Sequence, residues 1–443
     1  NMLTTCMNSQ GWIDPETGDF VEDPNHNPQY STFCYVFQYM PGTTTYLDTP
    51  VLPIAAHAGP DSFPLDCEFP DGTPRIYSVD APNNGHGGGP YVNAPGQQLT
   101  ITALGDTTVP NPDYNGTNAP TISRDYGFGS TPGTVTVNGT PLTNVTWSDT
   151  TITGTVAAGT NTGQLEITRG DNGLSTVTGV TVQIGLRPGA SVQTVTPGQS
   201  IQATIDAAGI NDLILVAPGT YDEMVIMWKP VQLQGWGEGS TTIRAVKLPQ
   251  EKLQAWRDKV ESLVTGNDVD LLPGQEPATF GGIEPEPLST EEGAGVLVLA
   301  KESEFGLADN RGSRIDGLTI TGADTGGGIV VNGYGRYLEI ANNRIISNQG
   351  FYGGGIRLGH PILTQETGAG LVYQDAHNDH ARIHNNHITQ NGGLGGAGGG
   401  VSLCTGSDEY ALNNNFICGN FNQGPGGGVG HLGLSHNGTI AGN

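Results

Sequence analysis

Four histidines and two aspartates are interleaved over residues 375–387. Imidazole and carboxylate ligands together suit zinc, copper or manganese, so this stretch is a candidate metal site. The alternative is that these are exposed polar residues on a loop and a strand. The last two histidines are three positions apart on an expected strand, where they tend to face opposite ways. The last of the four, His387, takes a repeat position whose side chain is expected to point outward and whose residue type is expected to vary freely. The candidate ligands are His377, His380, His384, His387, Asp375 and Asp379.

The five cysteines form two groups, and their odd number leaves at least one unpaired. Cys6, Cys34 and Cys67 fall in a proline-rich amino-terminal region that has no Cys-x-x-Cys motif. A disulfide among these three is favoured over a metal site, and it indicates an extracellular compartment. Cys404 and Cys418 are expected on neighbouring strands, where they either form a disulfide or remain small buried hydrophobic residues.

Acidic residues dominate the composition of the 443-residue chain, which has a formal net charge of −26. Such a surface repels nucleic acid and anionic lipid, so neither is an expected partner. No apolar run is long enough to cross a membrane. Acidic turns at residues 14–19 and 66–71 could bind calcium through oxygen ligands, or they could be ordinary solvated turns. Calcium is therefore the candidate cofactor.

The elements that position these residues follow from a repeat in the last third of the chain. The pattern Asn-x-Ile-x-x-Asn begins at Asn343, Asn386 and Asn415, and part of it returns at residues 438–443. Between these copies, Gly-Gly-Gly precedes an aliphatic residue. One period is about 27 or 28 residues, within the range of solenoids. The aliphatic positions that follow the glycines are Ile329, Ile356, Val401 and Val429.

This repeat predicts a parallel β-helix. Each short strand turns aliphatic side chains inward, and the next coil stacks an equivalent side chain on them. Asparagines at the same point of successive coils form a hydrogen-bonded ladder, and the glycines allow sharp turns. A tandem helical repeat could give a similar period, but it is disfavoured because so many Gly and Asn residues would break its helices.

Residues 97–184 predict an all-β sandwich. Asn138-Gly139 joins a strand at residues 134–137 to one at residues 142–147, which predicts a hairpin with a type I′ turn. The stretch resembles the immunoglobulin-like IPT/TIG module in Tyr126-Gly-Phe-Gly129, the Val-x-Val-Asn-Gly hairpin and Trp147-Ser-Asp149. The resemblance implies a spacer or a binding platform.

The β-helix is expected to open at about residue 190. A short helix over residues 200–208 has Ser200 in position to cap it. Pro218-Gly-Thr-Tyr221 and then Lys-Pro-Val-x-Leu-x-Gly at residues 229–235 follow in order. Together these elements resemble the opening coil of the pectate-lyase-like superfamily. The resemblance implies a right-handed parallel β-helix whose first helix covers the open end of the core.

Polysaccharide lyases of that superfamily use a basic residue on an outer sheet face, with calcium held by acidic residues nearby. The nearest matches to the basic residue are Arg357 and Arg344, and conceivable calcium ligands are Asp375, Asp379 and Glu339. No catalytic motif can be carried over residue by residue, and the paired aspartates of the related hydrolases are not evident.

The expected domains are a small proline-rich β domain over residues 1–95, an immunoglobulin-like β-sandwich over residues 96–186 and the β-helix over residues 187–443. A helical insertion at residues 247–294 and a loop insertion at residues 360–381 interrupt the coils, and the loop is the first place to expect a site. The fold class is all-β.

The expected function is that of a non-catalytic extracellular or cell-surface protein, one piece of a longer modular protein. It would build an extracellular assembly or bind glycans, with other surface proteins or end-to-end copies as possible partners at an open last coil. The alternatives are a polysaccharide lyase or hydrolase that acts on acidic glycans beside residues 360–381, and a metal-binding surface protein.

Overall fold

The computed structural model describes residues 2–27, 30–38, 66–114, 117–273, 275, 288–305, 313–361, 363–367 and 370–443. The chain divides into two compact units. The small unit comprises Asn1–Asp66 and Pro110–Ile122, and the large unit comprises Cys67–Val109 and Ser123–Asn443. Residues 67–95 thus belong to the large unit, although the sequence predicts that they end the amino-terminal domain.

The small unit contains a disulfide-linked pair of strands. Strand β1 (Met2–Met7) runs antiparallel to β4 (Phe33–Gln38), as fits the small β domain expected there. Cys6 lies directly opposite Cys34 in this pair, and the two form a disulfide. A second hairpin joins β2 (Gly11–Ile13) to β3 (Phe20–Glu22).

In the large unit, two mainly antiparallel sheets enclose one apolar cluster, and we call them the two-sheet domain. Alternate residues of the strands point into the cluster, as with Leu99 and Ile101, because side chains of a strand alternate between its faces. The first sheet has the order β11 (Thr140–Pro141), β10 (Thr134–Val137), β14 (Gly163–Thr168), β15 (Val180–Ile184), β6 (Tyr91–Val92). The second has the order β12 (Thr143–Trp147), β13 (Thr151–Thr155), β7 (Gln98–Ala103), β5 (Ile76–Asp80). A separate pair consists of β8 (Gly105–Pro110) and β9 (Thr121–Tyr126).

The predicted Asn138-Gly139 turn is present, but the hairpin is shorter than the sequence suggests. Both residues have positive φ, 49° and 72°, as a type I′ turn requires. Strand β10 pairs only with the two residues of β11, and the chain then crosses to β12 in the other sheet. Leu142 is buried in the shared cluster at this crossing. The prediction that residues 142–147 return along β10 is therefore wrong.

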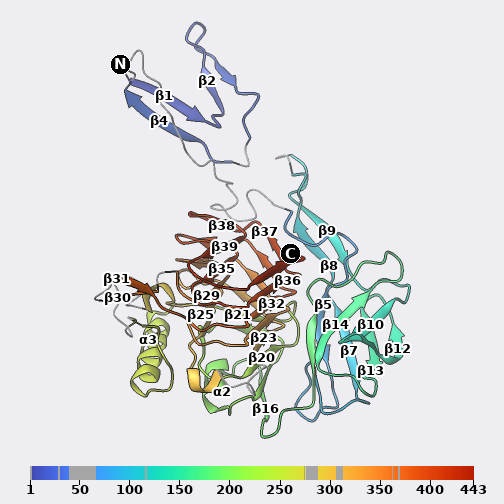
Figure 1. Cartoon of the computed structure of the whole chain (residues 1–443). Helices are drawn as coiled ribbons and strands as arrows, with labels where there is room; N and C mark the ends of the chain where they lie inside the picture. The colour runs from blue at the N-terminus through green and yellow to red at the C-terminus, as the bar shows by residue number, and fades with distance from the viewer. Residues whose placement is uncertain are drawn as a thin grey trace. The chain divides into compact units, whose positions relative to one another are not determined.

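The rest of the large unit is a stack of coils in which successive turns of chain add strands to three parallel sheets (Figure 1). The first sheet has the order β16 (Val192–Val195), β17 (Leu213–Val216), β20 (Gln232–Gly235), β23 (Arg314–Asp316), β26 (Glu339–Ala341), β32 (Arg382–His384), β36 (Ala411–Asn413), β40 (Thr439–Ala441). The second has the order β18 (Gly219–Tyr221), β21 (Thr241–Arg244), β24 (Thr319–Thr321), β27 (Arg344–Ile346), β33 (His387–Thr389), β37 (Phe416–Cys418). The third has the order β19 (Val225–Met227), β22 (Val296–Val298), β25 (Ile329–Val331), β29 (Ile356–Leu358), β35 (Val401–Cys404), β39 (Val429–Leu432).

The interior of the coils is the aliphatic stack that the repeat predicts. Ile345 lies in register with Ile388, which lies in register with Ile417. Ile345 and Ile388 are fully buried in one cluster that runs through the coils, and Ile417 packs against it from a partly buried position. A solenoid-like β-helix is therefore the architecture of residues 192–441.

Two asparagine ladders run along the coils at the ends of the second-sheet strands. In one, Asn343, Asn386 and Asn415 each donate a side-chain hydrogen bond to the asparagine of the next coil, at 3.1, 2.9 and 2.8 Å, and Asn443 is the last acceptor. Each of the three also donates to a main-chain carbonyl of the previous coil. The second ladder consists of Asn348, Asn391 and Asn420.

Two helices cover parts of the coil stack. Helix α2 (Ile201–Ala207) buries Ile201 and Ile205 in the coil interior, and Ser200 caps it by accepting from the Ala203 amide, as predicted. Helix α3 (Gln250–Thr265) packs Trp256, Val260 and Leu263 against the outer face of the third sheet. Shorter elements are η1 (Leu288–Thr290), α4 (Glu302–Phe305), a small parallel sheet of β28 (Gln349–Gly350), β34 (Gly392–Gly393) and β38 (Phe421–Asn422), and a hairpin of β30 (Thr364–Thr367) and β31 (Gly370–Tyr373).

Candidate functional site

Polar side chains line the outer face of the first parallel sheet. Because alternate residues of a strand face opposite ways, the buried Ile315, Ile340 and Ile383 leave their neighbours pointing outward. Two outward rows result, and each row stacks in register along the coils. One row contains Arg314, Glu339 and Arg382, and the other contains Asp316, Ala341 and His384.

The two-sheet domain packs on this face through hydrogen bonds. Thr181 donates to both carboxylate oxygens of Asp316, from its amide at 3.1 Å and from its hydroxyl at 2.7 Å. The Gln164 side chain donates to Asn342 at 2.6 Å. These contacts hold strands β14 and β15 against the coils and leave a cleft beside them.

This cleft has a volume of about 950 Å³ and mostly polar walls. On one side it is lined by Asn138, Thr162, Gly163, Gln164, Thr181, Gln183, Ile184, Gly185, Leu186 and Arg187. On the other side it is lined by Gln232, Arg314, Tyr337, Glu339, His380, Arg382 and His384. Its size is in the range of ligand-binding clefts.

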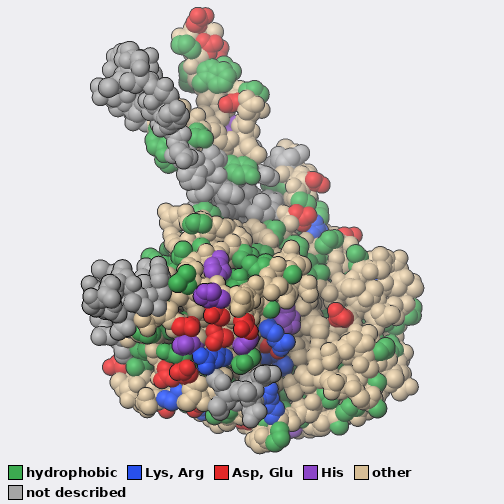
Figure 2. All heavy atoms as spheres, viewed as in Figure 1, with side chains coloured by type: hydrophobic (Ala, Val, Ile, Leu, Met, Phe, Trp, Pro, Cys, Tyr) green, Lys and Arg blue, Asp and Glu red, His purple; other side chains and the backbone are tan. Residues whose placement is uncertain are grey.

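Positive charge gathers in this cleft, although the chain has 43 acidic residues and only 17 lysines and arginines. Three of the arginines, Arg187, Arg314 and Arg382, line it. Glu339 is the single carboxylate among the described residues that line it. Figure 2 shows basic, acidic and histidine side chains gathered on the coils and where the coils meet the two-sheet domain. The charged side chains that line the cleft are therefore mostly basic, although the buried Asp316 lies 3.9 Å from Arg314.

Glu339 and His384 form an ion pair inside the cleft. His384 Nε2 lies 2.8 Å from Glu339 Oε1, and an Arg382 nitrogen lies 3.2 Å from the same oxygen. Burial alone would raise the pKa of Glu339, but the His384 hydrogen bond and the nearby arginine charges lower it to about 2. Burial alone would lower the pKa of His384, but its bond to ionised Glu339 raises it. His384 therefore keeps its proton at pH values where a free histidine loses it.

Buried hydrogen-bonding groups add to the polar character of the cleft. Arg314 is only 3% exposed, and one of its terminal nitrogens donates to Gln234 at 2.9 Å. The buried side-chain oxygens of Gln232 and Gln164 have no hydrogen-bond donor among the described residues.

The histidines expected to bind a metal are separated by the structure. His377 and His380 stack on the aromatic rings of the preceding coil, Tyr334 and Tyr337, at ring-centroid distances of 5.7 and 4.6 Å. His380 pairs with the carboxylate of Glu409 at 3.0 Å. Each of these two histidines thus stacks on an aromatic ring of the neighbouring coil.

A guanidinium group sits between the acidic and imidazole members of the predicted cluster. Arg336 contacts His377 Nδ1 at 3.0 Å and the Asp379 carboxylate at 3.0 Å. Asp375 lies 3.4 Å from His377 and accepts the His377 amide. In the described part of the chain, no three side chains of His, Cys, Asp or Glu converge in a way that could hold a metal ion.

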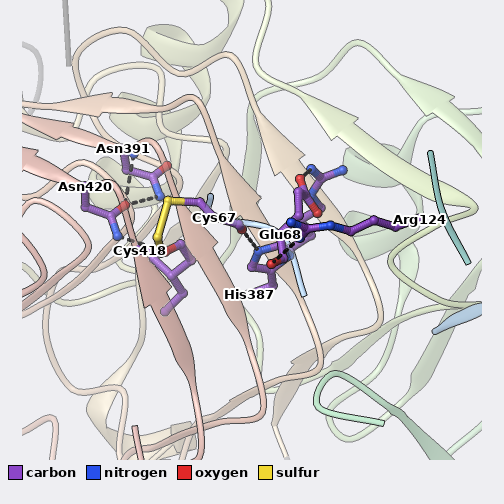
Figure 3. The surroundings of a disulfide bond; sticks show 9 residues. Cys67, Glu68, Arg124, His387, Asn391, Cys418 and Asn420 are labelled. Atoms are coloured by element: carbon purple, nitrogen blue, oxygen red, sulfur yellow. Dashed lines mark hydrogen bonds and ion pairs between the residues drawn. A yellow bond between two sulfur atoms is a disulfide. The ribbon is translucent and has the colours of Figure 1, made fainter. Parts of the chain in front are cut away.

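His387 does point away from its coil, as predicted, but it is fully buried rather than exposed. Residues 67–75, which we call the strap, cover it (Figure 3). His387 Nε2 lies 2.8 Å from the Cys67 carbonyl oxygen, and its ring packs 4.5 Å from the Phe69 ring. Burial, together with the charges of Arg75 and Arg344, lowers the pKa of His387 well below its usual value. Nothing in the local sequence of His387 indicates that a distant segment covers it.

The strap is held covalently. Cys67 forms a disulfide with Cys418, 351 positions later, and this bond is drawn in Figure 3. The alternative Cys404–Cys418 disulfide is therefore wrong. Cys404 is a free, buried cysteine, and burial raises the pKa of its thiol. Of the three amino-terminal cysteines, Cys6 and Cys34 form the expected disulfide.

The two arginines named as possible proton abstractors are both held in ion pairs by other segments. Arg344 pairs with Glu68 of the strap at 2.7 Å. Arg357 is 1% exposed and pairs with the fully buried Glu291 of the helical insertion. Neither lines the cleft. Of the residues described in the 360–381 loop, His380 is the one that does.

The acidic turns use their carboxylates within the protein. Asp14 Oδ1 accepts the Glu16 amide at 2.8 Å, and Asp71 Oδ1 accepts the Asp125 amide at 2.7 Å. The first is the bond of an ordinary aspartate turn, whereas the second joins two segments that are distant in the sequence. Glu339, which the sequence suggests as a calcium ligand together with Asp375 and Asp379, forms ion pairs with His384 and Arg382.

Searches with protein-family models, against curated proteins and against solved structures found no match to this chain. Within the residues that the structure describes, no helix has the length and apolar character needed to cross a membrane.

Proposed function

We propose that this chain is an extracellular or surface-attached protein that binds an acidic glycan in the cleft beside the coils, without cleaving it. The observation that carries the proposal is the exposed Arg382 in a cleft that Arg187 and the buried Arg314 also line, in a chain with a net charge of −26. Arginine is suited to carboxylate ligands because its planar group donates two parallel hydrogen bonds. The glutamine side chains and Tyr337 supply further groups for hydroxyls.

The architecture supports a scaffold role for the coils. Two disulfides, Cys6–Cys34 and Cys67–Cys418, fit an oxidising compartment. We propose that the coils are a right-handed β-helix of the pectate-lyase-like kind. We also propose that the two-sheet domain is an immunoglobulin-like module similar to IPT/TIG modules. The module then forms one wall of the cleft and acts as a binding platform.

The side chains of the cleft favour binding over hydrolysis. Most glycoside hydrolases place two carboxyl groups on either side of the bond that breaks. Glu339 is the single carboxylate among the described lining residues, and its pKa of about 2 makes it a poor proton donor. Elimination is the second candidate because Arg382, 59% exposed, is a basic residue on the outer sheet face.

Binding can be tested by calorimetry with oligogalacturonate and its uncharged methyl ester. We expect the acid to bind and the ester to bind at least tenfold more weakly, with the difference shrinking as salt screens the charges. Arg382→Gln should weaken binding of the acid by about tenfold. Arg244→Gln is the matched control, because Arg244 is an exposed arginine that pairs with Asp222 outside the cleft.

Equal affinity for acid and ester, or an unchanged affinity in Arg382→Gln, would contradict the proposal. The same samples, followed by ultraviolet absorbance, test for elimination, since a lyase creates a conjugated double bond. A rise in absorbance that disappears in Arg382→Gln would replace the binding role with catalysis.

A further inference from the structure

The strap contacts the coils through a small group of side chains that includes the buried His387. The His387 ring lies 4.5 Å from the Phe69 ring of the strap and 5.3 Å from the Phe416 ring of the next coil, measured between centroids. Phe69 and Phe416 also pack against each other at 5.0 Å. The Cys67–Cys418 disulfide joins the same two segments (Figure 3). His387 is therefore enclosed by the strap on one side and by the coils on the other, with no exposed surface.

The hydrogen bond to the strap determines which nitrogen of His387 carries the proton. The Cys67 carbonyl oxygen can only accept, so the protonated nitrogen is Nε2, which lies 2.8 Å from it. A second proton would have to bind Nδ1. This nitrogen is buried and has no hydrogen-bond partner among the described residues. Protonation of the ring in place would therefore create a charged N–H group without an acceptor, which is costly in a buried site.

The charges around His387 also oppose its protonation. Arg75 of the strap and Arg344 of the preceding coil both act on the ring as positive charges. Their partners are Glu68, which lies 2.7 Å from Arg344 and 3.1 Å from Arg75, and Glu238, which lies 2.7 Å from Arg75. In the described part of the chain, no carboxylate forms a hydrogen bond or an ion pair with the His387 ring. A positive charge on the ring would thus be added beside two others without a counterion of its own.

On its other side the strap is bound to β9 and to the residues that follow it. Arg124 donates to the carbonyl oxygens of Glu68 and Phe69 at 3.1 and 2.8 Å, and the Tyr126 hydroxyl donates to the Phe69 carbonyl at 2.8 Å. None of these bonds involves a residue of the coils. The strap can therefore lose its contact with His387 and still keep these bonds.

We propose that the strap is an acid-sensitive switch: protonation of His387 separates the strap from the second parallel sheet, while the coils stay folded and the Cys67–Cys418 bond keeps the strap tethered. Opening uncovers Arg344, His387 and Phe416, which form one outward row of that sheet. The switch lies on a different sheet from the cleft, so it does not depend on the proposed function.

The direction of the pH dependence follows from the two states of His387. In the open state the ring reaches water and gains its second proton at the pKa of an ordinary histidine, about 6.5. In the closed state burial and the two arginines hold the pKa well below that value. Above pH 6.5 the ring is neutral in both states and the strap stays closed. Below it, the population of the open state grows about tenfold for each pH unit.

The two disulfides of the chain provide the test. The full chain is treated with the reductant TCEP at pH 7.5 and pH 5, and mass spectrometry follows the loss of each disulfide. Cys6 and Cys34 are both exposed, so their bond is the internal reference for the reactivity of TCEP at each pH. Cys67 is only 2% exposed, so its bond should be reduced mainly when the strap opens. We expect reduction of Cys67–Cys418, relative to the reference, to become about thirtyfold faster at pH 5.

A third cysteine shows whether the coils stay folded. Cys404 is a free, fully buried thiol of the third sheet. In a sample without TCEP, it should remain unreactive toward dithiodipyridine at pH 5. Rapid labelling of Cys404 at pH 5 would mean that acid unfolds the coils, and it would overturn the proposal.

Variants assign the pH dependence to one side chain. His387→Gln can still donate to the Cys67 carbonyl but cannot gain a charge, so its relative rate should change less than about twofold between the two pH values. His436→Gln is the control, because His436 is an exposed histidine beside Asp408. It should behave like the parent. A relative rate in the parent that does not change with pH, or a pH dependence that persists in His387→Gln, would also overturn the proposal.

Discussion

Cys67 and Cys418 are 351 positions apart in the sequence, yet their Cα atoms lie 5.3 Å apart and their side chains form a disulfide. The bond fixes the strap to the second parallel sheet near the last coils. Around it, Glu68 pairs with Arg344, and Arg75 pairs with the buried Glu238 at 2.7 Å. The strap and the hydrogen bonds to Asp316 together attach the two-sheet domain to the coils at two separate faces.

Removing this disulfide should destabilise the large unit. In the double variant Cys67→Ser, Cys418→Ser we expect the free energy of unfolding to fall by about 2–4 kcal/mol, because the bond closes a very long loop in the unfolded chain. Urea unfolding measures the change. The matched control is Cys6→Ser, Cys34→Ser, which opens a bond of the small unit. An equal effect of both double variants on the large unit would show that the strap bond has no special role.

The burial of His387 predicts acid sensitivity. Its pKa is well below the usual value in the folded chain, so the unfolded chain binds a proton first as the pH falls. The contribution of His387 to stability should therefore be constant above about pH 6.5 and decline below it, by up to about 1.4 kcal/mol per pH unit. His387→Gln can keep a hydrogen bond to Cys67 without titrating. Urea midpoints between pH 5 and 7.5 should show a smaller slope for this variant, and an unchanged slope would assign the acid sensitivity to other groups.

The sequence predicts the inside of the coils well because the repeat encodes it. Ile345 and Ile388 recur at the period that stacks them, and Asn343 and Asn386 recur at the turn between strands. A residue at such a position meets its own equivalent in the next coil, so one period specifies many contacts. This is why strand register and both asparagine ladders follow from spacing alone.

The outside of the coils has no such regularity. Gln183 of strand β15 in the two-sheet domain accepts a hydrogen bond from Arg314 at 3.4 Å, and Arg187, which follows β15, lines the same cleft. Glu339 was among the candidate residues, but its partners His384 and Arg382 are known only once the register is known. Likewise, Arg344, Arg357 and His387 take outward repeat positions that distant segments cover. Docking of a non-repeating segment depends on tertiary contacts, and these leave no period in the sequence.

The raised pKa of His384 predicts that glycan binding depends on pH. Its proton is present below that pKa and lost as the pH rises through it, so the cleft becomes less positive in alkaline solution. We expect the affinity for oligogalacturonate to fall severalfold from pH 6 to pH 9 in the parent. His384→Gln should bind with little pH dependence over this range. The control is His436→Gln, which changes an exposed histidine beside Asp408, away from the cleft. A parent affinity that stays constant with pH would exclude His384 from the binding site.

The asparagine ladder predicts where a small change on the coils costs most. Asn386 donates to the Ile340 carbonyl at 2.9 Å and to Asn415, and its side-chain oxygen accepts two bonds from Asn343. All of these groups are buried. Asn386→Ala leaves several of them without partners, and each such group costs about 1–3 kcal/mol. We therefore expect the free energy of unfolding to fall by about 3 kcal/mol or more, measured by urea unfolding.

An exposed amide provides the comparison. Gln254 on α3 also makes a side-chain hydrogen bond, to Asp258 at 2.7 Å, but both residues are exposed to water. Gln254→Ala should change stability by less than about 0.5 kcal/mol, since water replaces the lost partner. If Asn386→Ala were as mild as Gln254→Ala, the ladder would be a consequence of stacked coils rather than a cause of their stability. A large difference instead means that each rung satisfies main-chain groups which the narrow turn hides from water.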